Sequence, residues 1–286
     1  MIAILTSPLF LRSLIAALLV GFAAPVVGTY LVHRRLAMLG DGIGHVALTG
    51  VALGWVVGSL ANLVPVDQLA VPGALLTSVA AAVAIELVRQ SGRTSADVVL
   101  AVLFYGGIAA GVVLIGLAGG TSTQLNSYLF GSLATVSWSD LAIIGAMAVI
   151  ILLFGVGLRP ALFSATSDED FAKATGLPVQ KLSMLIAVLA AITVAVAMRV
   201  VGALLVSALM IVPVATTGLI SKSFRGTMVS GMLLGGALSV IGLWITFFVD
   251  VSPGATIVVL AVTVYAAVFS FKVLADRLRP RRSVSH

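Results

Sequence analysis

Long apolar runs are the feature that most constrains how this chain can fold. A bilayer-spanning helix needs about 20 consecutive, mostly apolar residues, because inside lipid a helix satisfies its own backbone hydrogen bonds. Runs of this length recur along the whole sequence. They cover residues 9–32, 36–60, 69–88, 97–117, 138–158, 182–198, 200–220, 227–249 and 255–274. They are too continuously apolar for the strands of a membrane barrel, which have about 10 residues of alternating polarity.

These runs predict an all-α, polytopic membrane protein with about nine transmembrane helices. Only 9% of the residues are charged, against about 25% in soluble globular chains, so little of the surface can face water. The weakest boundary is Arg199, where two runs are cut from residues 182–220, and eight or ten crossings remain alternatives. Because the connections are short, we expect residues 1–286 to form a single integral membrane domain.

Basic residues indicate which side of the membrane each connection faces, because Lys and Arg in short loops favour the cytoplasm. We assign alternate connections to one side, starting with the C-terminal tail. That side receives every basic residue except Arg12 and Arg199. Its members are Arg34, Arg35, Arg89, Arg93, Arg159, Lys173, Lys181, Lys222, Arg225, Lys272, Arg277, Arg279, Arg281 and Arg282. We therefore expect the C-terminus in the cytoplasm and, with nine spans, the N-terminus outside.

The longest polar connection, residues 159–181, is expected to contain a short cytoplasmic helix at about 167–177. Ser167 is followed by three acidic residues, which is typical of a helix start, and Gly176 with Pro178 is a stop signal. A helix of about two turns is not stable alone in water, so it needs a surface to pack on. It is either an ordinary loop helix on the lipid headgroups or a docking element for a cytoplasmic subunit.

Asp41 and His45 lie in the second apolar run and suggest a metal site. A charged group inside a bilayer costs at least several kcal/mol, so such residues are functional candidates. Their spacing of four places both on one helical face, which Thr49 continues. A carboxylate and an imidazole at this spacing can share a divalent cation. The alternative is that Asp41 caps the helix and His45 donates to a backbone carbonyl.

Glycines surround this pair at positions that permit close packing. They are Gly40, Gly42, Gly44, Gly50, Gly54 and Gly58. Small residues four apart allow neighbouring helices to approach closely. We therefore expect close helix packing beside Asp41. Three glycines within five residues also weaken a helix, so local unwinding of the kind that lines transport sites is the other expectation. Gly40, Gly44, Gly50 and Gly54 are the candidates for packing or gating.

The remaining acidic residues have simpler explanations. Asp97 and Asp140 are expected in the first turns of their helices, and Glu86 is expected to pair with Arg89. Two others, Asp67 and Asp250, fall at the outer ends of spans. There they are either a candidate entrance for cations or solvated loop residues.

Several chemistries are excluded by missing residues. The chain has no cysteine, so thiolate metal sites and cysteine nucleophiles are ruled out. It has no Gly-Lys dipeptide and hence no P-loop for ATP, and no His-Glu-x-x-His metalloprotease motif. We therefore expect neither an enzyme nor a permanently bound cofactor.

Five segments resemble a known family. They are GDGIGHVALTGVALG (40–54), NSYLFGSL (126–133), FAKATG (171–176), VGALLVSALMIVPVAT (201–216) and DVSPGATIVVL (250–260). Together they are similar to the permeases of ATP-binding-cassette (ABC) importers for zinc, manganese or iron. The Gly-Asp-x-x-x-His helix and the VGALLVSALMIVP stretch are the most specific matches, and the five segments span most of the chain.

This resemblance implies a type II ABC importer-like permease in the bacterial cell membrane. The permease would be a homodimer that works with a cytoplasmic ATPase, which binds the ATP, and an extracytoplasmic metal-binding protein. The resemblance assigns the metal, as transported substrate, to Asp41 and His45. It assigns coupling to the ATPase to Asp170, Phe171, Ala172, Gly176 and Leu177. An ion-coupled secondary carrier and an ABC permease for a metal chelate or siderophore are the alternatives, and the sequence does not choose between zinc, manganese and iron.

Overall fold

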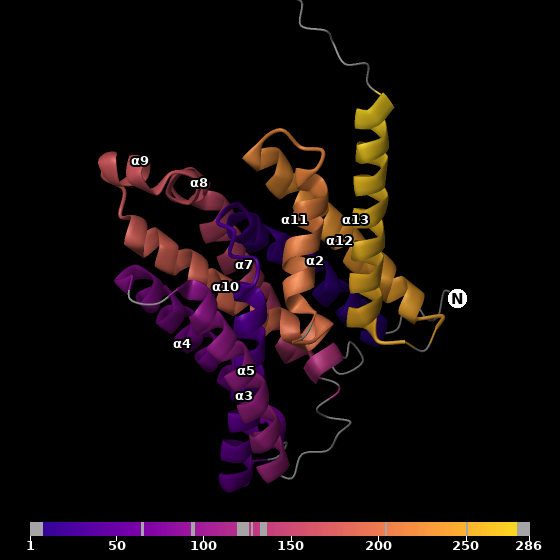
Figure 1. Cartoon of the computed structure of the whole chain (residues 1–286). Helices are drawn as coiled ribbons and strands as arrows, with labels where there is room; N and C mark the ends of the chain where they lie inside the picture. Colours follow the sequence, from indigo (N-terminus) through magenta and orange to yellow (C-terminus); the bar gives the residue numbers. More distant parts are fainter. Residues whose placement is uncertain are drawn as a thin grey trace, which may run out of the picture.

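The computed structural model describes residues 8–278 except 64–65, 93–94, 119–125, 127, 132–135, 204 and 250. The described residues form helices joined by short connections, as the apolar runs predict (Figure 1). The helices are α2 (Pro8–His33), α3 (Leu39–Leu60), α4 (Ala70–Ser91), α5 (Ala96–Leu117), α7 (Trp138–Gly157), α8 (Arg159–Ser167), α9 (Glu169–Ala174), α10 (Val179–Val201), α11 (Val206–Gly218), α12 (Phe224–Thr246) and α13 (Pro253–Leu278), with a 3-10 turn, η1 (Val66–Leu69), before α4.

Within the described ranges, eight helices are long and apolar enough to cross a membrane, which confirms the all-α polytopic fold. They are α2, α3, α4, α5, α7, α10, α12 and α13. The ninth run, 200–220, differs from the expectation. It forms the 13-residue α11, which at about 1.5 Å per residue is shorter than the hydrocarbon core of about 30 Å.

The break between α10 and α11 lies at Gly202, beyond the boundary expected at Arg199. The helix α10 continues through Arg199 to Val201 and ends because Gly202 has a φ of +93°. Such a conformation is strained for any residue with a β-carbon. The predicted boundary at Arg199 was therefore wrong by three residues. An arginine can remain in a helix, whereas a glycine with a positive φ ends it.

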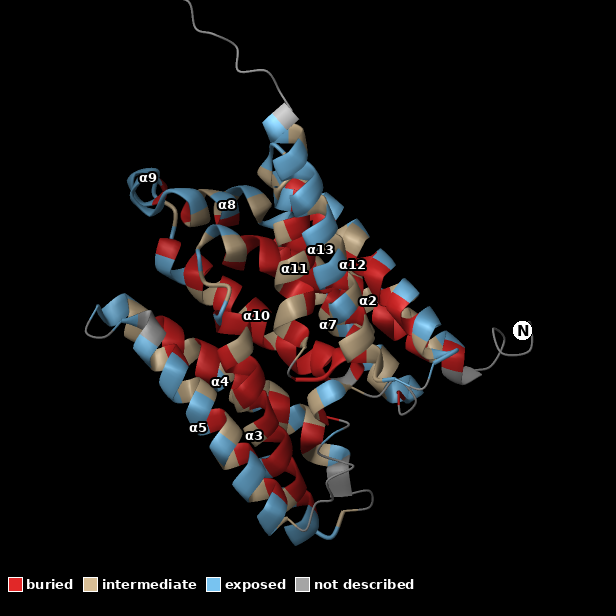
Figure 2. Ribbon diagram, turned by 45° about the vertical axis from the view of Figure 1, so that its right-hand side comes forward, coloured by how far each residue is buried: buried red, intermediate tan, exposed pale blue. Residues whose placement is uncertain are grey.

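The helices form two groups that meet along α10. The first group is α3, α4 and α5, in which α3 packs against both neighbours. The second group is built around α2, which packs against α7, α11 and α12. Helix α10 contacts both α4 and α2, and with α2 it is the most buried span (Figure 2). Helices α5 and α13 have few buried residues and form outer faces (Figure 2).

Three chain segments meet at the end of the bundle opposite α9, in what we call the three-glycine junction (Gly131, Gly202 and Gly254; Figure 1). A β-carbon on Gly202 would overlap the carbonyl oxygen of Leu129, and one on Gly254 would overlap that of Val201. A hydrogen bond from Ala203 N to Tyr128 O, of 2.9 Å, crosses the same contact. Another, from Ser252 Oγ to Phe130 O, is also 2.9 Å. The junction thus fixes where α10 ends and where α13 begins.

We expect Gly202→Ala to lower the stability of the folded protein by about 2 kcal/mol or more, because it adds both left-handed strain and an atomic overlap. The control is Gly116→Ala, since Gly116 is helical and a β-carbon there meets no atom within 4 Å. The measurement compares the thermal unfolding midpoints of the two variants in detergent. The folded fraction left after heating is read by size-exclusion chromatography. A midpoint for Gly202→Ala equal to that of the control would show that the contacts at Gly202 do not exclude a β-carbon.

Candidate metal site

Asp41 lies in the first turn of α3 and is joined to the start of α11. It is half-buried, and its Oδ1 accepts a hydrogen bond of 3.1 Å from Ser207 Oγ. The α3 helix is preceded by Met38, and no side chain caps it. Asp41 therefore does not act as the helix cap that the alternative interpretation required. Its carboxylate instead connects two helices that are far apart in the sequence.

His45 lies one turn further along α3 and is buried, with 3% of its surface exposed. Its ring packs edge-on against Phe104 of α5, with 4.2 Å between ring centroids. Its Nδ1 has no hydrogen-bond partner among the described residues. A buried polar atom without a partner is costly, so this nitrogen is available to a ligand. The imidazole and the Asp41 carboxylate lie on one face of the helix, as predicted from their spacing.

The glycines of α3 serve close packing, since the helix is continuous from Leu39 to Leu60 and shows no local unwinding. At Gly44, a β-carbon would lie 2.9 Å from the carbonyl oxygen of Ala203. At Gly40, it would face Ser207 and Met210 of α11. Gly50 and Gly54 play the same part toward Gly73 and Leu69 at the start of α4. These close contacts are consistent with packing, and a role of the glycines in gating stays a prediction.

A surface cavity of about 320 Å³ lies beside the pair, between α3 and α5. Its lining comprises Met38, Gly42, Leu100, Ala101, Phe104 and Tyr105. The ring of Phe104 both lines this cavity and packs against His45. A single aromatic side chain therefore separates the imidazole from the open space.

Asp41 and His45 supply two candidate ligands. Among the described residues, no group of three or more His, Cys, Asp and Glu side chains could hold a metal ion. The Ser207 hydroxyl adds one neutral oxygen next to Asp41. Zinc sites in proteins are generally four-coordinate, and manganese takes about six ligands, so groups from outside this set must complete the coordination.

Other charged residues fall partly where they were expected. Glu86 is buried and accepts two hydrogen bonds from Arg89, of 2.9 and 2.8 Å, as predicted. Asp140 closes a capping box with Ser137 at the start of α7, also as predicted. The side chains of Asp67, Asp97, Arg199 and Asp250 lie outside the described part of the structure, so the candidate entrance remains a prediction.

The polar connection contains two helices where the sequence indicated one. Helix α9 ends at Ala174, earlier than the expected end near residue 177. The turn after it contains Gly176, whose φ is +81°, and Leu177 N donates to Ala172 O at 3.0 Å. The start of α9 differs from the expectation, because Asp168 is the cap and accepts a hydrogen bond of 2.9 Å from Phe171 N. Ser167 instead ends the additional helix α8. The missed signal for α8 was Pro160 in its first turn, followed by an apolar pair one turn apart that is buried.

We call residues 159–178 the coupling segment, and only part of its sequence is accessible. Asp170 and Phe171 are exposed, and 61% of the Phe171 surface is accessible. Ala172, in contrast, is fully buried and packs α9 against its own chain. The accessible part of α9 therefore combines an acidic group and an aromatic group.

Comparison with known proteins gives consistent matches over most of the chain. The sequence model of the ABC 3 transport family matches residues 6–272. The manganese transport system membrane protein MntC of Halalkalibacterium halodurans is 33% identical over 261 residues, which are 91% of this chain and 86% of that protein. The high-affinity zinc uptake system membrane protein ZnuB of Haemophilus influenzae is 30% identical over 251 residues, 86% of this chain and 92% of that protein. The solved structure of PsaBC from Streptococcus pneumoniae in complex with Fab matches with a TM-score of 0.82 at 30% identity, covering 94% of this chain and 95% of that chain.

We expect Gly107→Ala to destabilise the candidate site by about 1–3 kcal/mol, the usual effect of overpacking. A β-carbon on Gly107 would lie 2.8 Å from the backbone of His45, so α5 would have to move away from α3. The control is the neighbouring Gly106→Ala, because Gly106 faces open space. Thermal unfolding followed by tryptophan fluorescence measures both variants, and equal midpoints would show that α5 does not contact His45 as described.

Proposed function

Because this chain belongs to the ABC 3 transport family, we propose that it is the membrane-spanning permease subunit of an ABC importer that carries manganese or zinc into the cell. The match over residues 6–272 confirms the resemblance seen in the sequence. Relatives named for manganese and for zinc transport support a divalent transition metal as the substrate. Membership of an ABC family does not favour the ion-coupled carrier.

The observation that carries this proposal is the buried imidazole of His45, with an unpartnered Nδ1, one turn from the Asp41 carboxylate. The carboxylate neutralises part of the charge of a dehydrated cation, and the imidazole supplies a nitrogen ligand. Ser207 holds Asp41 Oδ1 in place, and Phe104 shields His45 from the adjacent cavity. Oxygen and nitrogen ligands of this kind suit both manganese and zinc, so the pair itself does not select between them.

A second copy of the chain is our proposal for completing the site. Two ligands from one protomer are too few for a divalent metal, whereas two symmetric pairs supply four. The α3–α5 face carries the cavity next to the pair, and Ala101, Val102 and Tyr105 on it are exposed. Dimerisation through this face would place the metal path between the protomers.

We infer the orientation of the chain from the order of the same helices. The connections after α2, α4, α7 and α11 and the end of α13 fall on one side when successive spans alternate, with α11 counted as a crossing. They carry the basic residues that favour the cytoplasm. The coupling segment lies on that side, and we place the C-terminus there as well. The three-glycine junction then faces outward, where a metal-binding protein would deliver the substrate.

A separate cytoplasmic ATPase is the partner proposed for the coupling segment. The chain has no P-loop of its own, so hydrolysis must occur in another protein. Asp170 and Phe171 offer the accessible surface, while Gly176 and Leu177 form the turn that returns the chain to α10. Ala172 fixes α9 to the bundle from behind, because it is buried. Docking would therefore use one face of α9 and move the helix as a unit with α10.

We expect Asp41→Asn or His45→Ala to reduce uptake of manganese and zinc by about tenfold or more, because each change removes one of two ligands. Uptake is measured with radioactive metal in cells that express the permease with its ATPase and binding protein. Co-purification of the ATPase is measured in parallel and is expected to be unchanged.

The matched controls are Asp276→Asn and His33→Ala, which make the same chemical changes at exposed positions. Both are expected to transport at the wild-type rate. Normal uptake by Asp41→Asn and His45→Ala would show that the pair does not carry the metal. A wild-type protein that transports neither metal would instead contradict the proposed substrate.

We expect Phe171→Ala to weaken binding of the ATPase by about 2 kcal/mol, the scale of an aromatic anchor at an interface. The measurement is the amount of ATPase that remains with the permease after purification in dilute detergent. Phe248→Ala is the control, because Phe248 is similarly exposed, 63% against 61%, but lies after α12 at the opposite end of the bundle. Equal retention of the ATPase by both variants would exclude Phe171 from the docking surface.

A further inference from the structure

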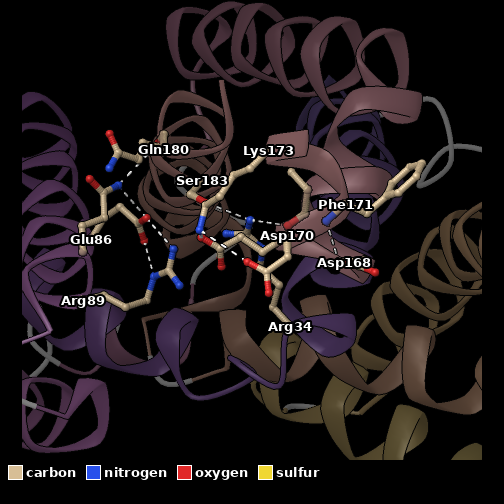
Figure 3. A network of polar contacts seen from close by, with 12 residues as sticks. Arg34, Glu86, Arg89, Asp168, Asp170, Phe171, Lys173, Gln180 and Ser183 are labelled. Atoms are coloured by element: carbon tan, nitrogen blue, oxygen red, sulfur yellow. Dashed lines mark hydrogen bonds and ion pairs between the residues drawn. The ribbon is translucent and has the colours of Figure 1, made fainter. Parts of the chain in front are cut away.

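Arg34 lies between the coupling segment and the helix that carries the metal ligands. It is the first residue after α2, in the connection 34–38 that leads to α3. Its Nη2 donates to Ala165 O in α8 at 3.1 Å and to Ser183 Oγ in α10 at 2.8 Å (Figure 3). One guanidinium therefore joins the helices that lie before and after α9.

The partners of Arg34 are buried, so the contact is not an ordinary solvated loop interaction. Ser183 is 1% exposed and Ala165 is 2% exposed. Burial and the positive charge of Arg89 lower the pKa of Arg34, while the carboxylates of Glu86 and Glu169 act in the opposite direction. A partly buried charge needs such hydrogen bonds, because losing them leaves it unsolvated. Arg34 is therefore expected to follow α8 and α10 when they move.

The connection that contains Arg34 is stiff. Arg35 has a φ of +59°, and Leu36 N donates to Leu31 O at 2.9 Å, which closes the end of α2 in a tight turn. Leu39 N then donates to Leu36 O at 3.0 Å, directly before the turn that holds Asp41. Backbone hydrogen bonds thus tie Leu36 both to the end of α2 and to the start of α3. A displacement of Arg34 is therefore expected to reach the first turn of α3.

A second set of contacts ties α4 to the same end of α10. Buried Glu86 accepts a hydrogen bond of 2.9 Å from Gln90 Nε2 in addition to those from Arg89. Gln90 Nε2 also lies 3.4 Å from Gln180 O in the first turn of α10 (Figure 3). This network supports the position of α10, but α4 is one helix removed from the ligands. Arg34 is the shorter route to Asp41.

We propose that Arg34 is the positioning residue that transmits movement of the coupling segment to the metal helix. When the ATPase shifts α9, Ala165 and Ser183 move with α8 and α10. Arg34 moves with them and displaces the connection 34–38 and the first turn of α3. The inference rests on the proposed function, since it concerns how hydrolysis in a partner reaches the metal ligands.

The first test compares Arg34→Gln with Arg35→Gln in the complete complex of permease, ATPase and binding protein in proteoliposomes. Metal uptake and ATP hydrolysis are measured on the same vesicles. We expect Arg34→Gln to retain the ATPase and hydrolyse ATP, but to import about tenfold less metal per ATP. Arg35 is exposed and adjacent, so Arg35→Gln is expected to keep the wild-type ratio. A wild-type ratio in Arg34→Gln would overturn the inference.

If Arg34→Gln does not assemble, Ser183→Ala is measured in the same way, because it removes one of the two acceptors and leaves the charge in place. We expect a loss in the same direction, of about threefold. A wild-type ratio of uptake to hydrolysis in Ser183→Ala overturns the inference equally.

The second test needs no transport. The chain has no native cysteine, so spin labels can be placed at Lys173→Cys in α9 and Met38→Cys at the start of α3. With Arg34 present, we expect the distance between the labels to stay narrow when ATP is trapped, since both segments move together. With Arg34→Gln, we expect the distribution to shift or broaden on trapping. Identical distributions in both backgrounds would overturn the inference, even if the Asp41 and His45 variants confirm the metal site.

Discussion

Direct backbone contact around α3 is the interaction on which the rest of the structure depends. In lipid, helices gain little from hiding apolar side chains, so their association relies on close packing. Gly50 and Gly73 bring α3 against α4, and Gly107 brings α5 against the backbone of His45. A side chain at any of these positions would separate the helices. Helix α3, which carries Asp41 and His45, is thereby packed closely on two sides.

This close packing offsets the cost of keeping polar groups without full hydrogen-bond partners inside the membrane. An unpaired imidazole nitrogen destabilises the fold by several kcal/mol in a dry interior, and the packing around His45 has to offset this. Asp41 is treated differently, because Ser207 already donates to one of its oxygens. The carboxylate is therefore held in place, whereas the imidazole remains available. A cation entering the site would exchange water for ligands whose positions are already fixed, which reduces the entropy lost on binding.

The sequence predicted the features that depend on local rules and missed those that depend on distant contacts. Run length and the spacing of Asp41 and His45 were sufficient for the membrane fold and for the shared helical face. The end of α10 was misplaced because residues 200–220 stay apolar throughout, and only contact with Leu129 shows why Gly202 must turn. Arg34 was counted merely as a cytoplasmic loop charge. Its acceptors lie 131 and 149 residues away, a separation that no local pattern encodes.

Helix α10 connects the two ends of the molecule that transport has to coordinate. It begins at Val179, directly after the turn that closes α9, and it ends at the three-glycine junction. Its 23 residues span about 35 Å as one uninterrupted rod. In the proposed orientation, a tilt of this rod as a unit would carry a shift at its cytoplasmic end to its outer end. The same helix therefore connects the proposed docking surface at one end with the three-glycine junction at the other.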